Sequence, residues 1–318
     1  MRSKFAYISI SCLALLTSCQ SAGDSFAVRT ICPSGAPTIA FYDQGNNENF
    51  ETNSSPNLVL AQFQTNYYNA IVFDSISGLQ SIKQYDLSFK LAKIITGGNF
   101  YIASINKDEG TEPTADDVLV SFGEGLIPDL VYKKLYEHWG WQANTSYVKS
   151  VAEAQAILKT GKTSGNVDVD YVFIAQPALN AAMLDITAAT YGKVKVFKNI
   201  REEWKTLTGQ EAIPQAAMFY RYDDYQNHSR EFDTYTLALE NRIIQGITQP
   251  ENVKNVMDEY SSDLTIQAQK FGFNSNIMLH TQKDGANGFG LVNPDISVDV
   301  NSFLTYLGLE TYEASYFL

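Results

Sequence analysis

The sequence predicts an α/β protein with largely parallel sheets, divided between two lobes. Short apolar runs rich in β-branched residues alternate with amphipathic helical patterns over most of the chain, and this alternation is typical of parallel sheets covered by helices. Two polar segments that contain Gly and Pro, 106–116 and 209–214, interrupt the alternation. We therefore expect these two segments to be the crossovers between the lobes.

The N-terminal segment indicates export. Arg2 and Lys4 precede an apolar run that ends at Leu16 and is short for a membrane span, and Leu16-Thr17-Ser18-Cys19 is similar to a bacterial lipobox. The alternative is a plain secretory signal with an incidental cysteine. We expect residues 1–18 to be a lipoprotein signal peptide, Cys19 to carry lipid and residues 19–28 to form a tether.

Composition limits what the mature chain can do. Residues 1–18 hold two basic and no acidic residues, so their removal moves the formal net charge from -12 to -14. Such an acidic chain is a poor partner for nucleic acid. Cys12 leaves with the signal and Cys19 carries lipid, so Cys32 stands alone and no disulfide framework is expected.

The expected elements of the first half follow from apolar runs and their punctuation. Asp74-Ser75 is a plausible cap for the helix after the second strand, and Thr96-Gly97-Gly98 separates two later strands. In order, we expect a strand over 37–42 that closes in the turn 43–47, a helix over 57–63, a strand over 69–73, a helix over 76–82, and strands over 87–95 and 99–105.

The stretch 117–139 shows the repeating unit most clearly. An apolar run over 118–120 is broken by Gly123-Glu124-Gly125, and a helix follows in which Ile127, Val131, Leu135 and Trp139 share one face. Ligands of α/β sheets gather at such strand ends, so we interpret this turn as one wall of a ligand cleft.

The second half continues the same alternation. Gly161 stops a helical pattern, and Pro177 suits a first helical turn. We expect strands over 147–148, 170–175, 193–198 and 215–222, and the last of them returns to the first lobe. We expect one helix over 151–158, a second that begins at 176, and a third that follows the strand 193–198 and ends at about 207. The remaining helices are expected over 232–243, 253–260, 274–282 and 301–307. The expected lobes are 29–108 with 214–318, and 109–213.

Catalytic and metal motifs are missing from the sequence. The three histidines lie in separate predicted helices or at their edges, and no H-E-x-x-H, C-x-x-C, G-x-S-x-G or phosphate-binding glycine loop occurs. We therefore expect no enzyme, no cofactor and no metal site.

An ordered set of short segments resembles the solute-binding lipoproteins of ABC importers, in particular the sulfonate, nitrate and thiamine-precursor binding group. These segments are the lipobox, 37–46, 68–73, 89–92, 98–101, 123–125 and 175–177. The resemblance implies a type II periplasmic-binding fold, with a ligand cleft between two lobes that close on a small-molecule solute. It also implies a monomer, anchored by the Cys19 lipid on the extracytoplasmic face of the cell membrane, that delivers the solute to an ABC permease with its ATPase. The alternative is a surface lipoprotein of the same fold that acts as an adhesin or sensor without transport.

The candidate ligand-binding residues follow the predicted strand ends. They are Asp43, Gln44 and Asn46, Asp74 and Ser75, Thr96 and Asn99, Gly123 and Glu124, and Gln176. The first three groups have plain structural alternatives, which are turn chemistry, a helix cap and a hairpin turn. The alternative for Glu124 is contact with the permease.

The expected charge of the cleft points to the class of solute. Anion-binding relatives commonly place Ser or Thr in the turn that here spans 123–128 and holds apolar Leu126 and Ile127 beside Glu124. No Arg occurs in the loops expected at the cleft. Uncompensated carboxylates would repel an anion by roughly several kcal/mol, so we expect a neutral or cationic organic solute, with a heteroaromatic one as an example. Aromatic side chains that would stack on it, or else belong to the core, are Tyr42, Phe73, Phe100 and Tyr101.

Overall fold

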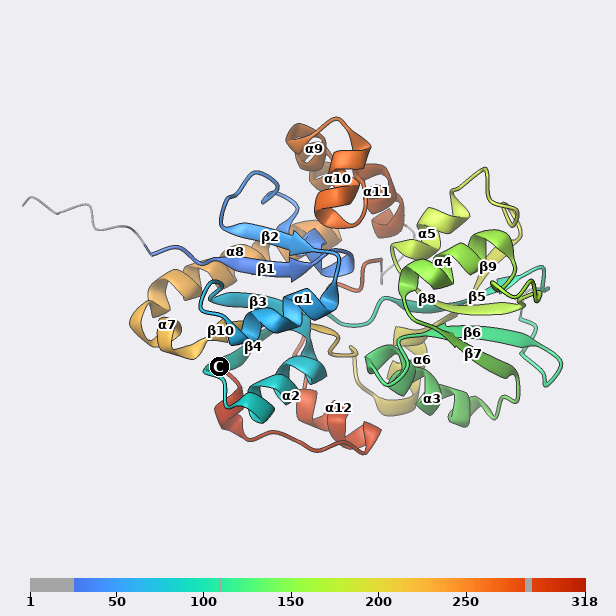
Figure 1. Ribbon diagram of the computed structural model, residues 1–318, viewed down its shortest axis with the longest axis horizontal. Coiled ribbons are helices and arrows are strands. Elements are labelled where there is room, and N and C mark those ends of the chain that lie inside the picture. Colours follow the sequence, from blue (N-terminus) through green and yellow to red (C-terminus); the bar gives the residue numbers. More distant parts are fainter. Residues whose placement is uncertain (1–25, 109, 284–287) are drawn as a thin grey trace, which may run out of the picture.

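The computed structural model describes residues 26–108, 110–283 and 288–318, in which two five-stranded sheets lie side by side as two lobes (Figure 1). The predicted signal peptide, Cys19 and the tether up to residue 25 lie outside the described residues. In the part of the chain that is described, none of the helices combines the length and apolar character that crossing a membrane requires.

The first sheet has the strand order β2-β1-β3-β10-β4. β1 runs parallel to β2 and β3, whereas β10 runs antiparallel to both of its neighbours. The bounds are β1 Thr30–Pro33, β2 Phe50–Asn53, β3 Ala70–Asp74, β4 Phe89–Thr96 and β10 Ala216–Arg221.

The second sheet has the order β7-β6-β8-β5-β9. β6 runs parallel to β7 and β8, and here β5 is the strand that runs antiparallel to its neighbours. Both sheets are therefore mixed rather than largely parallel. The bounds are β5 Phe100–Ile105, β6 Val118–Phe122, β7 Asn144–Val148, β8 Tyr171–Ala175 and β9 Val194–Asn199.

Helices cover both faces of each sheet. In the first lobe, α1 and α2 pack on one face around Ile71 and Phe219, and η1 and α8 pack on the other around Val72 and Met218. The helices of this lobe and its flanks are η1 Ala36–Phe41, α1 Pro56–Leu60, η2 Ala61–Gln64, α2 Ser75–Tyr85, α7 Tyr222–Asn227, α8 Ser229–Thr248, α9 Pro250–Tyr260, α10 Leu264–Phe271, α11 Ser275–Lys283, α12 Val300–Leu307 and η3 Ala314–Tyr316.

In the second lobe, α4 and α5 lie on one face of the sheet, and α3 and α6 lie on the other (Figure 1). The predicted helix after the Gly123-Glu124-Gly125 turn is confirmed as α3, with Ile127, Val131 and Leu135 buried. The bounds are α3 Ile127–Trp139, α4 Val151–Thr160, α5 Ala178–Met183 and α6 Ile200–Thr208.

The chain passes between the sheets at two places. Residues 97–99 join β4 to β5, and residues 209–215 join α6 to β10. A third segment runs beside the first crossing, because the Gly97 amide donates to the Gly290 carbonyl at 2.6 Å and the Val292 amide donates to the Ile95 carbonyl at 3.0 Å. Three stretches of backbone therefore meet where the lobes join.

Two expectations about organisation need correction. Segment 106–116 does not cross between the lobes; it joins β5 to β6 within the second sheet. β5, which the sequence analysis assigned to the first lobe, pairs with β8 and β9 instead, because the chain has already crossed at Gly97 and Gly98. Sheet membership thus ends the first part of the first lobe at Thr96 rather than at 108.

The expected strand over 37–42 is also wrong. Residues 36–41 form the 3₁₀ helix η1, which starts after Gly35 in a positive-φ conformation and has Pro37 in its first turn. The first strand is instead β1, Thr30–Pro33, which the sequence analysis missed together with β2. The residues of η1 are largely buried, so their apolar run reflects burial rather than strand geometry.

Candidate functional site

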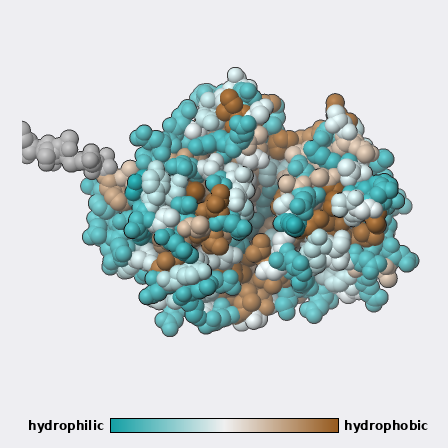
Figure 2. Space-filling model, viewed as in Figure 1, coloured by the Kyte–Doolittle hydropathy of each residue, from teal (hydrophilic) through white to brown (hydrophobic). Residues whose placement is uncertain are grey.

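The carboxyl ends of the parallel strands of both sheets lie on the side where the chain crosses. β4 ends at Thr96, and only three residues separate it from the start of β5 at Phe100, so the ends of β1, β3 and β4 face the ends of β6, β8 and β9. Figure 2 shows a depression between the two lobes over this junction. Ligands of open α/β sheets bind outside the carboxyl ends of strands, so these facing edges form the candidate site.

On the first lobe, the edge is built by Asp74, Ser75, Thr96 and Gln215. The Ser75 hydroxyl donates to the Pro214 carbonyl at 2.5 Å, and the Ala216 amide donates to Thr96 Oγ1 at 3.1 Å. The Ser75 amide donates to the Gln215 carbonyl at 2.9 Å, and the Gln215 amide donates to the Thr96 carbonyl at 3.0 Å. Ser75 and Thr96 are fully buried, so they hold the second crossing in place rather than offer free groups to a ligand.

Asp74 caps α2 as the sequence predicted. Its Oδ1 accepts a hydrogen bond from the Ser77 amide at 2.8 Å, which satisfies one of the free amides of the first turn. Desolvation at the sheet edge raises the pKa of Asp74, and the hydrogen bonds from Ser77 and Ile76 act in the opposite direction. The carboxylate is thus a capping group that carries an electrostatic cost when it is ionised.

On the second lobe, the predicted glycine turn follows β6 at the cleft edge. Gly123 and Gly125 both have positive φ, 69° and 78°, which explains the need for glycine at these two positions. The buried carboxylate of Asp129 holds the turn by accepting from the Gly125 amide at 2.8 Å, and Glu124 between the two glycines is exposed. Glu124 is therefore free to meet a solute or a partner at the rim.

Asn99 and Gln176 are bonded to each other across the start of β5 and the end of β8. The Gln176 amide donates to the Asn99 carbonyl at 2.8 Å, and Asn99 Nδ2 donates to the Gln176 carbonyl. Asn99 is 2% exposed and Gln176 is 6% exposed. Gln176 Oε1 accepts from the Asn180 amide at 3.1 Å, so it also caps the first turn of α5.

Some buried polar atoms at this junction have no hydrogen-bond partner. Among the described residues these include Asn99 Oδ1 and Gln215 Oε1, together with Ser121 Oγ one residue before the end of β6. The orientation of the Asn99 amide is fixed, because the Gln176 carbonyl can only accept and must therefore face Nδ2. A buried acceptor without a donor is unfavourable by about 1–3 kcal/mol. A ligand that donates a hydrogen bond to Asn99 Oδ1 would remove this cost, so Asn99 Oδ1 is the strongest indication of ligand binding at the site.

Asp43, Gln44 and Asn46 lie away from the facing edges. Because η1 runs back along β1, the loop that contains them leads into β2 at its amino end, where the Thr30 amide donates to the Asn49 carbonyl at 2.8 Å. Asp43 instead pairs with Arg242 of α8 at 2.7 Å. The error follows directly from interpreting 37–42 as a strand.

The four aromatic side chains suggested for stacking are buried in the hydrophobic core. Phe73, Phe100 and Tyr101 belong to the cluster that continues between the lobes, and Tyr42 belongs to the cluster under α8, with its hydroxyl bonded to Gln245. Their exposure is 9% or less. These four side chains therefore belong to the core, which was the alternative to stacking on a solute.

Arg201 is a residue at this junction that the sequence analysis missed. It follows the end of β9 and is only 8% exposed, and its Nε donates to the Glu211 carbonyl at 2.9 Å while Nη1 lies 3.5 Å from the Leu291 carbonyl. Burial lowers the pKa of its guanidinium. Arg201 thus ties the second crossing and the third segment to the second lobe, and corrects the expectation that no Arg lies there.

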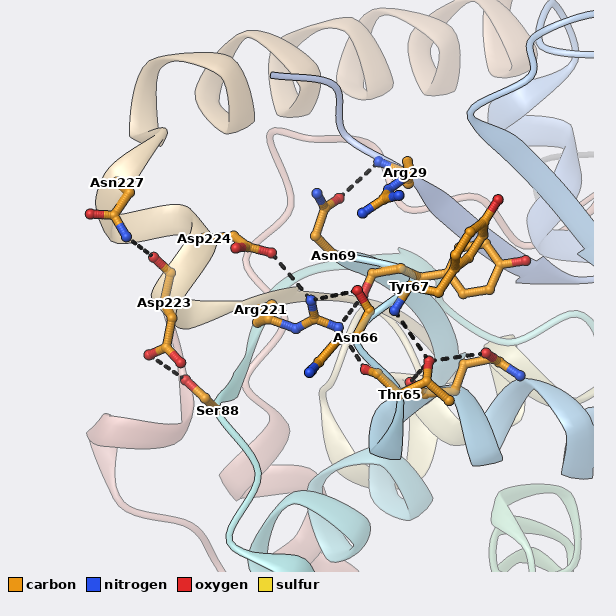
Figure 3. Close-up of polar contacts among 12 residues, drawn as sticks. Arg29, Thr65, Asn66, Tyr67, Asn69, Ser88, Arg221, Asp223, Asp224 and Asn227 are labelled. Carbon is orange, nitrogen blue, oxygen red and sulfur yellow. Dashed lines mark hydrogen bonds and ion pairs between the residues drawn. The ribbon is translucent and has the colours of Figure 1, made fainter. Parts of the chain in front are cut away.

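A second polar cluster, around Arg221, lies at the other end of the first sheet (Figure 3). The two terminal nitrogens of Arg221 donate to the carbonyls of Asn66, Thr65 and Tyr68 at 2.7–3.2 Å, and Nη1 also lies 3.4 Å from an Asp224 carboxylate oxygen. Because these bonds are made within the protein, the cluster fastens the loop before β3 to the end of β10. It is a structural clamp and not a candidate site.

No protein-family model and no curated protein sequence matches the chain. Solved structures do match. A structure titled as an ABC transporter from Parabacteroides distasonis aligns with a TM-score of 0.60 at 15% identity, over 92% of this chain and 98% of the other. The periplasmic aliphatic sulphonate-binding protein SsuA from Escherichia coli aligns with a TM-score of 0.60 at 12% identity, over 88% and 85%.

A Candida albicans gene product, described as exhibiting the generic periplasmic binding protein structural fold, aligns with a TM-score of 0.54 at 9% identity, over 92% of this chain and 94% of the other. Identities this low establish the fold and leave the ligand open. The chain has the two-lobed α/β periplasmic-binding fold that the sequence predicts, with the candidate site between the lobes.

Proposed function

We propose that the protein is an extracytoplasmic solute receptor of an ABC importer, anchored in the cell membrane by lipid on Cys19. The lobes close on a small molecule and present it to a permease that works with an ATPase. The observation that carries the proposal is the buried Asn99 Oδ1, without a partner, at the junction of two facing sheet edges. Solved structures of the same fold titled as ABC transporter and sulphonate-binding proteins support it.

The atoms without partners favour a neutral or cationic solute that carries N–H groups. Asn99 Oδ1 and Gln215 Oε1 are acceptors, and Asp74 and Glu124 add carboxylates on the two walls. Arg201 is the opposite charge nearby, but its guanidinium donates its hydrogen bonds to the Glu211 and Leu291 carbonyls of the crossing segments. A donor-rich solute would satisfy the acceptors and meet a favourable field, whereas a sulfonate would add acceptors to acceptors.

A matched solute panel tests both parts of the proposal. Thermal shift and native mass spectrometry would compare an aliphatic sulfonate, an aliphatic amine of equal length, and a neutral and a protonated heteroaromatic amine. A bound solute at a hundredfold excess over its Kd stabilises by about 2.7 kcal/mol, which is readily seen as a rise in Tm. Preference for the sulfonate would refute the solute class but keep the receptor. No shift with any solute would favour the alternative of an adhesin or sensor with this fold.

Two substitutions localise the binding. Gln215→Met keeps the length of the side chain but removes the acceptor, so it should weaken a donor-bearing solute. Gln44→Met is the matched control, because Gln44 lies on the loop before β2, away from the junction. Equal loss in both variants, or in neither, would mean that the solute does not contact this edge.

A further inference from the structure

The two lobes touch on both flanks of the candidate site, and the two contacts differ in kind. On one flank, α5 of the second lobe meets α11 of the first; on the other, α6 and α3 meet α12 (Figure 1). The first contact includes a buried side-chain hydrogen bond, from Asn180 Nδ2 to Thr281 Oγ1 at 3.2 Å. The second places the fully buried Trp204 against Phe303, with ring centroids 5.4 Å apart.

A buried hydrogen bond joins the lobes at α5–α11, whereas two large aromatic rings pack together at α6–α12, and this difference favours separation at α5–α11. Asn180 and Thr281 are 3% and 1% exposed, and water would replace their hydrogen bond if the helices parted. Separation of Trp204 from Phe303 would instead expose large apolar surfaces to water, which is strongly unfavourable. Opening is therefore easier at α5–α11, with the axis of motion near α6 and α12.

The polar contact also connects to the candidate site. The backbone amide of Asn180 donates to the side-chain Oε1 of Gln176 at 3.1 Å, and the backbone carbonyl of Gln176 accepts from Asn99 Nδ2. A solute that satisfies Asn99 Oδ1 would fix Asn99, and through it Gln176 and the first turn of α5. A solute bound in the cleft would in this way also stabilise the α5–α11 contact between the lobes.

We propose that Asn180 and Thr281 form a latch that holds the lobes closed at the opening edge of the clamp. The latch rests on the proposed closure of the lobes, and Asn180 is a positioning residue in it rather than a ligand contact. Loss of the hydrogen bond should raise the ratio of open to closed molecules by about fivefold before any solute is added.

The test measures the distance between the lobes in solute-free mature protein. Spin labels at Ile186→Cys, beyond α5, and at Ile266→Cys, on α10, use exposed positions on opposite lobes, while Cys32 is buried. Pulsed electron–electron double resonance should show that Thr281→Val shifts the distribution of distances between the two labels toward longer values. Thr281→Ser keeps the hydroxyl and should leave it unchanged.

Thr248→Val is the matched control, because its hydroxyl donates to the Ile244 carbonyl of its own helix at 2.8 Å. The latch is refuted if Thr281→Val lowers Tm but leaves the distance distribution as in this control, or if Thr281→Ser opens the protein as much as valine does. The solute panel on the same variants separates the two proposals. If Thr281→Val opens the protein but no solute of the panel binds to any variant, the latch stands and the receptor proposal is weakened. If a solute binds but Thr281→Val does not open the protein, the receptor stands and the latch falls.

Discussion

Gly97 lies where the three segments between the lobes come closest, so Gly97→Ala should destabilise the protein through overpacking alone. A Cβ at this position would lie 2.6 Å from Ala212 Cβ and 2.8 Å from Val292 Cγ2, whereas carbon atoms normally contact at about 3.5–4.0 Å. Ala212 and Val292 belong to the other two segments and are 3% and 2% exposed, so neither can move toward solvent. The segments would have to spread by roughly 1 Å, for which overpacking costs are about 1–3 kcal/mol.

The expected loss corresponds to a fall in Tm of about 2–5 °C for a protein of this size, measured by calorimetry with urea unfolding as a second readout. Gly165→Ala is the matched control. Its φ is also outside the left-handed region, but its nearest neighbour is Thr163 Oγ1 at 3.7 Å, an ordinary contact, so its Tm should stay level or rise slightly. Equal Tm values for the two variants would show that the segments are not packed against Gly97 as described, and the joint between the lobes would need another account.

Four further substitutions test the site. Asp74→Asn keeps a capping side chain but cannot ionise. Because folding raises the pKa of Asp74, ionisation of this carboxyl destabilises the folded state, so the variant should be more stable than the unsubstituted protein at pH 7. This gain should disappear below about pH 4, where Asp74 is protonated, and urea unfolding at several pH values would measure it. Asp74→Ala should lose about 1 kcal/mol with the cap as well as weaken a cationic solute. Glu124→Ala, on an exposed turn, should weaken such a solute in calorimetric titration without a change in Tm, and unchanged affinity would remove Glu124 from the site. Arg201→Met should lower Tm by several degrees, because the Glu211 carbonyl loses a buried charged donor; a neutral result would mean that water replaces the guanidinium.

Local signals predicted most elements because each is encoded within a few residues. The Asp74 cap, the glycine turn before α3 and the stop at Gly161 all appear in the structure. The run over 37–42 failed because a short apolar segment reports burial and does not distinguish a strand from a buried helical turn. β1 and β2 are four residues long each, too short for a period to emerge.

Non-local pairing explains the rest of the differences. The polar run over 106–116 looks like a linker, whereas the real crossing is the tripeptide 97–99, whose glycines pack against Ile213, Ala212 and Val292 from distant segments. No local pattern reports that contact. Arg201 was missed for the same reason: its significance comes from the Glu211 and Leu291 carbonyls, and the second of these is 90 residues away in the chain.

The two antiparallel strands, β5 and β10, follow from where the chain crosses. β4 ends at the edge that faces the other lobe, so the chain enters the second sheet at its facing edge and can only run away from the cleft, opposite to strands whose carboxyl ends point into it. The return through 209–215 imposes the same direction on β10. The residues that precede these strands, Asn99 and Gln215, are consequently both crossing residues and wall residues, and both carry an acceptor without a partner. Substitution at either should alter solute affinity and lobe position together, whereas substitution at Glu124, on a turn within one lobe, should alter affinity alone.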